Sequence, residues 1–227
     1  MISSNKPGVK DYSSPEGHVL LVDKPLQWTS FDVVKKLKYS LNLKKVGHAG
    51  TLDPLATGLL ILCTGKKTKQ IESYQSQGKE YEGTLVLGQT TPSYDLETEP
   101  TAAVDISHIT QEEIEKATLK FIGEIEQTPP IYSAVKVDGK RAYLHARKGN
   151  DIKLRSRVVT IDKFDITSID LPQVKFLVSC SKGTYIRSLV NDFGNQLGVG
   201  AHLSQLRRTK IGDYKVNDAY TIEELTA

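Results

Sequence analysis

The sequence predicts a mixed α+β protein with a mixed, largely antiparallel central sheet flanked by helices and long loops. Three observations lead to this prediction. Runs typical of strands are interleaved with segments of helical periodicity, their order follows no regular βαβ rhythm, and no internal repeat is apparent. The chain has 227 residues, of which 38% are hydrophobic and 25% charged, so it is able to bury a core of its own. This composition excludes a collagen, a coiled coil and a wholly disordered chain.

The expected strands rest on continuous apolar runs or on strict alternation. Residues 19–22 and 58–63 are apolar runs that indicate buried strands, and residues 81–87 alternate between apolar and polar side chains. An Asp-Gly pair at 138–139 is a turn signal that predicts a hairpin after a short strand. Residues 89–108 have no clear period and are expected to form a long loop. The expected strands are residues 19–22, 58–63, 81–87, 134–137, 158–169 and 174–180.

The expected helices rest mainly on signals at their N-termini. Thr29 is followed three residues later by Asp32, and Thr110 by Glu113, and both patterns match a capping box. Apolar residues follow at the spacing of one helical face. The expected helices are residues 30–41, 66–74, 110–121, 142–148 and 184–197, with a last short helix opened by Thr221.

Basic residues are concentrated in one part of a nearly neutral chain. The net charge is only +3, but residues 131–160 hold eight basic and two acidic residues. Such a block predicts a polyanion-binding surface, and a solvated charged face is the alternative. Lys136 and Arg147 belong to this block, and we expect both to bind the substrate. Three more lysines on the first expected helix reach into solvent or toward an anion: Lys35, Lys36 and Lys38.

The N-terminus and the cysteines predict a cytoplasmic protein. Residues 1–16 are polar and resemble a flexible arm rather than a secretory signal, and residues 17–227 contain no composition break, so we expect one domain there. The longest apolar run, residues 59–63, is far too short for a membrane span. Cys63 and Cys180 have no metal-ligand or disulfide spacing. Neither a phosphate-binding loop nor a GxGxxG motif is present, so we expect no cofactor and no metal. Nothing indicates an interface, which favours a monomer.

The richest motif is the loop at residues 47–58, with the sequence GHAGTLDPLATG. Its glycines and proline restrict the backbone, and between them lie His48 and Asp53. A restricted loop can present an aspartate rigidly, as a nucleophile or general base requires. The alternative is that Asp53 caps a turn before Pro54 and that His48 pairs with backbone.

Two further clusters carry side chains suited to chemistry. Tyr81 begins an expected strand, where it is either a packing residue or a stacking platform with a hydroxyl for proton transfer. Arg187 lies in the first turn of an expected helix, where an arginine is unfavourable for the helix dipole. It is therefore expected to hold a carboxylate, and a surface arginine beside Asp192 is the alternative.

Together these motifs resemble the TruB family, the tRNA pseudouridine-55 synthases, over about residues 17–225. The loop at 47–58 is the most specific element of the resemblance. The other matching segments are residues 23–25 with 29–30, 79–81, 87–89, 130–136, 146–147, 180–187, 200–203 and 206–208. This resemblance covers nearly the whole chain.

The resemblance implies the pseudouridine synthase fold, long loops that bind RNA, and a role for each matching residue. Asp53 would be the catalytic carboxylate, Tyr81 would stack on the target base, and Arg187 would pair with the catalytic carboxylate. The glycine that often follows the family's loop aspartate is absent after Asp95. The remaining implied contacts are Tyr185 and Leu206 in the uracil pocket, His48 against the RNA near the flipped nucleotide, and Asp95 as a hydrogen-bonding loop aspartate.

The implied reaction is isomerisation of uridine at position 55 in the T-loop of tRNA, without a cofactor. Asp53 could add to the ring, attack the sugar or assist an elimination, and the residues do not distinguish these routes. A synthase guided by a separate RNA and a non-catalytic RNA-binding protein are the competing readings. Many family members carry a further RNA-binding domain of the PUA type, which we do not expect in this chain.

Overall fold

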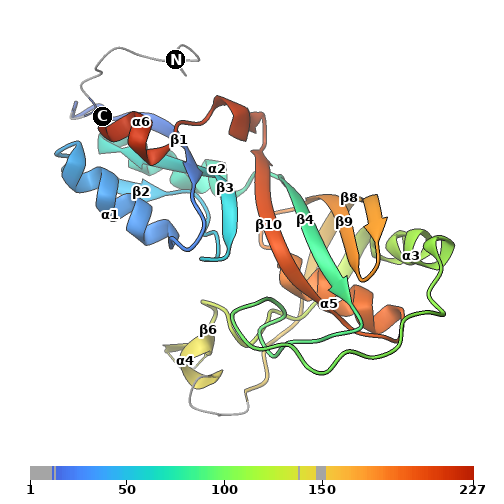
Figure 1. Cartoon of the computed structure of the whole chain (residues 1–227). Coiled ribbons are helices and arrows are strands. Elements are labelled where there is room, and N and C mark those ends of the chain that lie inside the picture. Colours follow the sequence, from blue (N-terminus) through green and yellow to red (C-terminus); the bar gives the residue numbers. More distant parts are fainter. Residues whose placement is uncertain (1–11, 13, 138, 147–151) are drawn as a thin grey trace. The chain divides into compact units, whose positions relative to one another are not determined.

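The computed structural model describes residues 12, 14–137, 139–146 and 152–227 and divides into two compact units. The first unit takes in residues 1–81 and 206–227, and the second takes in residues 82–205. The chain leaves the first unit within strand β4 (Lys79–Leu87) and returns to it within strand β10 (Ala201–Ile211). Both strands are labelled in Figure 1. Both strands therefore contribute residues to each unit.

The first unit is organised around strand β3 (Ala56–Thr64), which is buried along nearly its whole length. Strand β1 (Val19–Lys24) pairs with it antiparallel on one edge, and β10 pairs with it parallel on the other. Two short strands complete this part: β2 (Val46–His48) pairs with β3, and β11 (Tyr214–Lys215) pairs with β10. The helices of this unit are α1 (Ser30–Ser40), η1 (Gly65–Gln70), α2 (Ile71–Gln75), η3 (Val216–Asp218) and α6 (Ile222–Thr226).

The core of the first unit lies on both faces of β1 and β3. Because side chains alternate along a strand, Leu60 and Leu62 pack on one face, with α1 and α6, while Leu59 and Ile61 pack on the other. This two-sided burial explains why the sequence of β3 is a continuous apolar run rather than an alternating one. Figure 1 shows α1 and α6 beside these strands.

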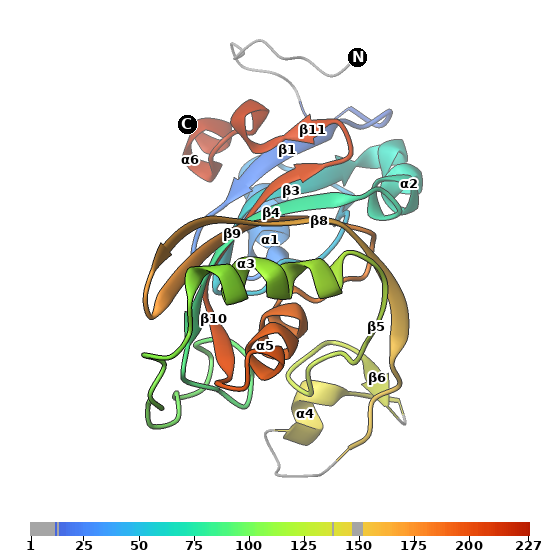
Figure 2. The same ribbon diagram turned by 90° about the vertical axis from the view of Figure 1, so that its right-hand side faces the viewer.

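The second unit is an antiparallel sheet covered by two helices. Its strands follow the order β10-β4-β9-β8-β5, and β8 and β9 form a long antiparallel hairpin. Helices α3 and α5 pack against this sheet (Figure 2), where the rings of Phe164 and Phe193 lie 5.4 Å apart. The elements of this unit not yet bounded are α3 (Gln111–Thr118), η2 (Leu119–Phe121), β5 (Gly123–Gln127), β6 (Lys136–Val137), β7 (Lys140–Arg141), α4 (Ala142–Ala146), β8 (Arg157–Asp170), β9 (Gln173–Cys180) and α5 (Ile186–Gln196).

The predicted fold class is confirmed, as are most of the expected elements. Both capping boxes form, with Thr29 on α1 and Thr110 on α3, and a third caps α6. The helix expected at 66–74 is a 3₁₀ turn followed by α2, and the hairpin expected after 134–137 is β6 with β7. The end of the helix expected at 142–148, most of the arm at 1–16 and Asp138 lie outside the described residues.

The sequence does not predict four of the strands: β2, β5, β10 and β11. Strand β10 is the largest omission, because buried polar residues interrupt its apolar pattern: His202 is 2% exposed and Arg208 is 1% exposed. Arginine is usually exposed, so a sequence pattern assigns it to the surface unless its buried partners are known. The partners of Arg208 lie in distant parts of the sequence. In the described part of the chain, no helix has the length and apolar character needed to cross a bilayer.

Candidate active site

The loop that carries Asp53 is the connection between strands β2 and β3. His48 of β2 pairs with Leu62 of β3, so the segment between the two strands forms a closed turn. The Ala49 amide donates to the Ile61 carbonyl (2.8 Å), and the Ala56 amide donates to the Asp53 carbonyl (3.1 Å). The Asp53 side chain is half-buried and so remains partly accessible at the end of this turn.

The residues on both sides of Asp53 are held by the segment that precedes and begins α1. The Leu52 amide donates to Ser30 Oγ (2.9 Å), and Ser30 Oγ lies 3.3 Å from the Leu52 carbonyl oxygen, to which it donates. On the other side, the Pro54 carbonyl accepts from the Gln27 amide (2.8 Å). Hydrogen bonds to the backbone of Leu52 and Pro54 therefore fix the chain before and after Asp53, which limits the freedom of its carboxylate.

Lys24, at the end of β1, places a buried positive charge beside the same loop. Its side chain is 0% exposed, and its Nζ donates to the carbonyls of Trp28 (2.6 Å), Pro25 (2.9 Å) and Pro54 (3.4 Å). Burial lowers the pKa of Lys24 to about 8, and the negative charge of Asp53 partly opposes that shift. The ammonium group of Lys24 and the carboxylate of Asp53 therefore stabilise each other.

Arg208 supports the loop from strand β10. Its Nε donates to the Leu59 carbonyl (2.8 Å), and one terminal nitrogen donates to the Gly50 carbonyl (3.3 Å). The backbone of β10 approaches β3 so closely that a Cβ on Gly58, where φ is +102°, would lie 2.3 Å from the Arg208 carbonyl oxygen. Arg208 therefore ties β10 to both the first half of the loop and the strand that follows it.

The other predicted site residues of the first unit lie on neighbouring strands. Leu206 pairs with Ala56 and is 9% exposed, and Tyr81 of β4 is 8% exposed. Glu80, beside Tyr81, accepts a hydrogen bond from Thr209 (2.8 Å), which places β4 next to β10. Burial lowers the pKa of His48, a hydrogen bond with the Gly50 backbone partly opposes this shift, and the charge of Arg208 adds to it, so the imidazole is neutral at neutral pH. The structure thus brings His48, Asp53, Tyr81 and Leu206 onto adjacent strands or the turn between them.

In the second unit, Arg187 pairs with Asp95. Its Nε lies 3.4 Å from Asp95 Oδ2, and the two side chains are 4% and 7% exposed. Arg187 also donates to the Ser93 carbonyl (3.1 Å), and Asp95 Oδ1 accepts from the Glu97 amide (2.9 Å). The expectation that Arg187 holds a carboxylate is confirmed for Asp95. The pairing of Arg187 with Asp53 joins residues of different units and stays a prediction.

Tyr185 is fixed by its backbone at the start of α5. Its amide donates to Gln127 Oε1 (2.7 Å), and its carbonyl accepts from Gln127 Nε2 (3.0 Å). The guanidinium of Arg157 lies 4.7 Å from the centre of the Tyr185 ring, within the range of a cation–π contact. Of the two basic residues expected to bind substrate, Lys136 lies in β6, and Arg147 lies outside the described residues.

Three residues that build the site received no role from the sequence: Lys24, Ser30 and Arg208. Each belongs to a segment that carried the family resemblance, so the sequence contained a signal for its importance. The sequence did not reveal what these residues do, because all three side chains bind backbone carbonyls or amides, and a pattern of side chains does not show which backbone groups lie nearby. Within the described ranges, no three His, Cys, Asp or Glu side chains are grouped so that they could hold a metal ion.

Comparison with known proteins identifies the class to which this fold and this loop belong. Residues 38–186 match the TruB family pseudouridylate synthase N-terminal domain, and residues 187–227 match the tRNA pseudouridylate synthase B C-terminal domain. The chain belongs to the TruB family of pseudouridylate synthases. It is therefore an isomerase that forms pseudouridine.

Individual relatives give the same result. The chain is 57% identical over 214 residues to the tRNA pseudouridine synthase B of Flavobacterium johnsoniae, covering 91% of this chain and 93% of that protein. It is 53% identical over 216 residues to the tRNA pseudouridine synthase B of Chloroherpeton thalassium, covering 93% of this chain and 90% of that protein.

Solved structures confirm the pseudouridine synthase fold. A crystal structure of a Cbf5-Nop10-Gar1 complex matches with a TM-score of 0.72 and 33% identity, over 92% of this chain and 56% of that chain. An H/ACA RNP bound to a substrate RNA containing 2'-deoxyuridine matches with a TM-score of 0.68 and 28% identity, over 98% of this chain and 59% of that chain. The present chain thus spans less than two thirds of these structures.

Proposed function

We propose that this chain converts uridine 55 in the T-loop of tRNA to pseudouridine, with Asp53 as the essential carboxylate. The observation that carries the proposal is the anchoring of the Asp53 loop through hydrogen bonds to the residues before and after the aspartate. The names of the relatives, tRNA pseudouridine synthase B, support tRNA as the substrate. We further expect the protein to act as a monomer in the cytoplasm.

The reaction exchanges one bond to the sugar for another. The bond between N1 of uracil and C1′ breaks, the base turns, and a bond between C5 and C1′ forms. The proton on C5 leaves and N1 gains one, so no atoms or electrons are gained or lost. Asp53 would take part by attacking C1′, adding to the ring, or assisting an elimination, each of which requires an ionised carboxylate. The buried ammonium of Lys24 favours that ionised form.

The other site residues would bind and orient the base. The target uridine lies in a folded loop, so it must be flipped out at a cost of a few kcal/mol. Stacking on Tyr81 would recover about 1–3 kcal/mol of this cost, and its hydroxyl is suited to proton transfer at C5. Tyr185 and Leu206 would line the uracil pocket, and the neutral imidazole of His48 would contact the RNA near the flipped nucleotide.

Basic side chains would hold the T-arm of the tRNA through its phosphates. The block at residues 131–160 supplies eight basic residues, among them Lys136 and Arg147. The guanidinium of Arg187 is buried against Asp95 and the Ser93 carbonyl. We propose that this pair orders the turn that carries Asp95, and that Arg187 also orients the carboxylate of Asp53.

The experiment that tests the proposal is to incubate the protein with an unmodified tRNA transcript and to map pseudouridine at each position. We expect product at the T-loop uridine alone. Asp53→Asn, which keeps the size of the side chain, is expected to abolish product while tRNA affinity is retained. No product from the wild-type protein would overturn the proposed activity, and product at many positions or only with an added guide RNA would overturn the proposed substrate.

A further inference from the structure

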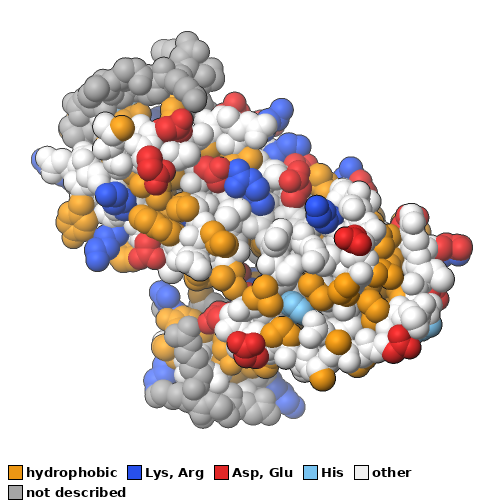
Figure 3. Space-filling model, in the orientation of Figure 1, with side chains coloured by type: hydrophobic (Ala, Val, Ile, Leu, Met, Phe, Trp, Pro, Cys, Tyr) orange, Lys and Arg blue, Asp and Glu red, His pale blue; other side chains and the backbone are white. Residues whose placement is uncertain are grey.

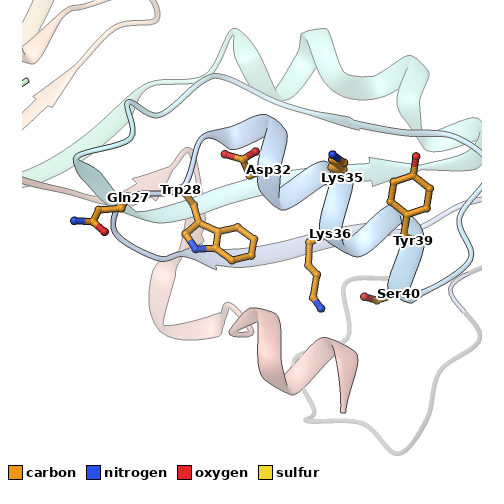
Figure 4. A pocket seen from close by; sticks show the side chains of 7 residues that line it. All are labelled: Gln27, Trp28, Asp32, Lys35, Lys36, Tyr39 and Ser40. Atoms are coloured by element: carbon orange, nitrogen blue, oxygen red, sulfur yellow. The ribbon is translucent and has the colours of Figure 1, made fainter.

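An open pocket of about 540 Å³ lies on the solvent-facing side of α1 in the first unit. Its walls come from the segment before the helix and from the outer face of the helix itself (Figure 4). The volume falls in the range of sites that hold a small ligand or one nucleotide. The lining residues are Gln27, Trp28, Asp32, Lys35, Lys36, Tyr39 and Ser40.

The core does not use this face of α1. The opposite face buries Val33, Val34 and Leu37, which pack against β1 and β3. The lining positions of α1 recur at the helical spacing of three or four residues, so they form one continuous stripe along the helix. At one end of this stripe Tyr39 is 73% exposed, which is a large apolar surface to leave in contact with water.

Aromatic rings are available in this pocket for stacking. Trp28 packs partly against the core cluster beneath α1, so its ring has a supported position while one part remains accessible. Trp28 precedes α1, and Figure 4 shows its ring on the same side of the helix as Lys36, whereas Lys35 and Tyr39 lie on the other side. An indole with an ammonium group beside it offers both a stacking surface and a phosphate contact.

The charge around the pocket is positive. Lys35 and Lys36 line it, and residues 27–45 hold five lysines against a single acidic residue, Asp32. That carboxylate is committed to the cap of α1: its Oδ2 accepts from the amide (2.9 Å) and the hydroxyl (2.6 Å) of Thr29, and these bonds lower its pKa. Over α1, at the left of Figure 3, hydrophobic and basic side chains lie next to each other.

We propose that the pocket on α1 binds one unpaired nucleotide of an RNA, with Trp28 stacking on the base, Lys36 holding its phosphate and Lys35 adding to the positive charge of the pocket. The combination of an aromatic surface and neighbouring cations fits single-stranded nucleic acid. A lipid surface fits less well, since a membrane-bound helix buries a broad apolar face, and the apolar face of α1 is already used by the core.

The pocket is connected to the Asp53 loop through the backbone. The Gln27 amide donates to the Pro54 carbonyl (2.8 Å), and the Trp28 carbonyl accepts from Lys24 Nζ (2.6 Å). A nucleotide held at Trp28 would therefore be bound by the same segment that supports the catalytic loop. Binding of RNA at this pocket rests on the proposed function, because the ligand is again RNA. The pocket is nevertheless separate from the site that takes the target uridine.

The test uses the fluorescence of Trp28, which is the only tryptophan in the chain. A short oligocytidylate is the probe, because it contains no uridine and its signal is independent of catalysis. We expect saturable quenching. Replacing both Lys35 and Lys36 by alanine should weaken binding about three- to tenfold and reduce the salt dependence by about one unit of slope. The matched control removes two exposed lysines of the second unit, Lys120 and Lys175, and should leave binding unchanged.

A second pair of variants tests the stacking, with a labelled oligocytidylate followed by fluorescence anisotropy. Trp28→Ala should weaken binding about fivefold or more, and Trp28→Phe should retain most of it because a ring remains. Absence of quenching, equal weakening in the Lys120 and Lys175 control, or quenching by anionic vesicles alone would overturn the inference. Failure of the proposed function would be seen separately, as absence of pseudouridine with this binding intact.

Discussion

Removing the hydroxyl of Ser30 should loosen the Asp53 loop without changing any group that touches the substrate. Ser30 Oγ accepts from the Leu52 amide (2.9 Å) and donates to the Leu52 carbonyl (3.3 Å), and the two residues are 2% and 4% exposed. In Ser30→Ala the buried amide loses this acceptor, which costs about 1–3 kcal/mol. For a chain of this size, a loss of 2 kcal/mol lowers Tm by about 4–8 °C.

The assay for this variant combines thermal unfolding with the kinetics of pseudouridine formation. Because Leu52 precedes Asp53, we expect kcat to fall about tenfold while KM stays unchanged. Ser73→Ala is the matched control, since the Ser73 hydroxyl bonds to the Gln70 carbonyl (2.7 Å) in an exposed position, and its effect should be within about 0.5 kcal/mol. If Ser30→Ala matches this control in both stability and kcat, the hydrogen bonds of Ser30 do not position the loop and the reasoning is refuted.

Three other substitutions test the packing and charge of the fold. Burial lowers the pKa of Lys24 from 10.5 to about 8, so between these pH values the unfolded chain binds more protons than the folded chain and the free energy of unfolding rises with pH. In urea unfolding, the stability of the wild type relative to Lys24→Met should therefore increase by about 2 kcal/mol between pH 7 and about pH 9.5. No increase would contradict the buried charge. Asp95→Asn removes the buried negative charge that lies 3.4 Å from Arg187 Nε and should cost about 3 kcal/mol in the same assay, whereas a cost under about 1 kcal/mol would mean that the pair is not stabilising. Gly58→Ala forces a Cβ to 2.3 Å from a backbone oxygen and should prevent folding, as judged by circular dichroism. The control Gly123→Ala, where nothing lies within 4 Å of the new Cβ, should lower stability far less. Equal effects of the two substitutions would contradict the close approach of β10.

Local signals predicted the elements that depend on neighbours in the sequence. The capping box at Thr29 and Asp32 fixes the start of α1 through contacts within three residues, and the alternating apolar pattern gives β4 its face. The same loop that resembled the TruB family also proved to be the turn between β2 and β3. These predictions succeeded because the physical cause and the sequence pattern lie in the same short segment.

Contacts between distant segments escaped prediction. Arg207 forms a two-bond pair with Asp23 (3.0 and 2.6 Å), 184 positions away, and Arg208 binds the Leu59 carbonyl 149 positions away. The sequence around these arginines shows neither partner, and strand β10 was therefore missed. The division into two units was not visible either, because the chain leaves the first unit and returns to it without a change in composition.

The central claim is that Asp53, held by its loop, carries out the isomerisation of a tRNA uridine. The most direct measurement is release of tritium from C5 of uridine in a labelled tRNA transcript, since the C5 proton must leave when the new bond to C1′ forms. Wild-type protein should release the label of one uridine for each tRNA, and Asp53→Asn should release none while binding the tRNA with unchanged affinity. Release by Asp53→Asn at the wild-type rate would contradict the account.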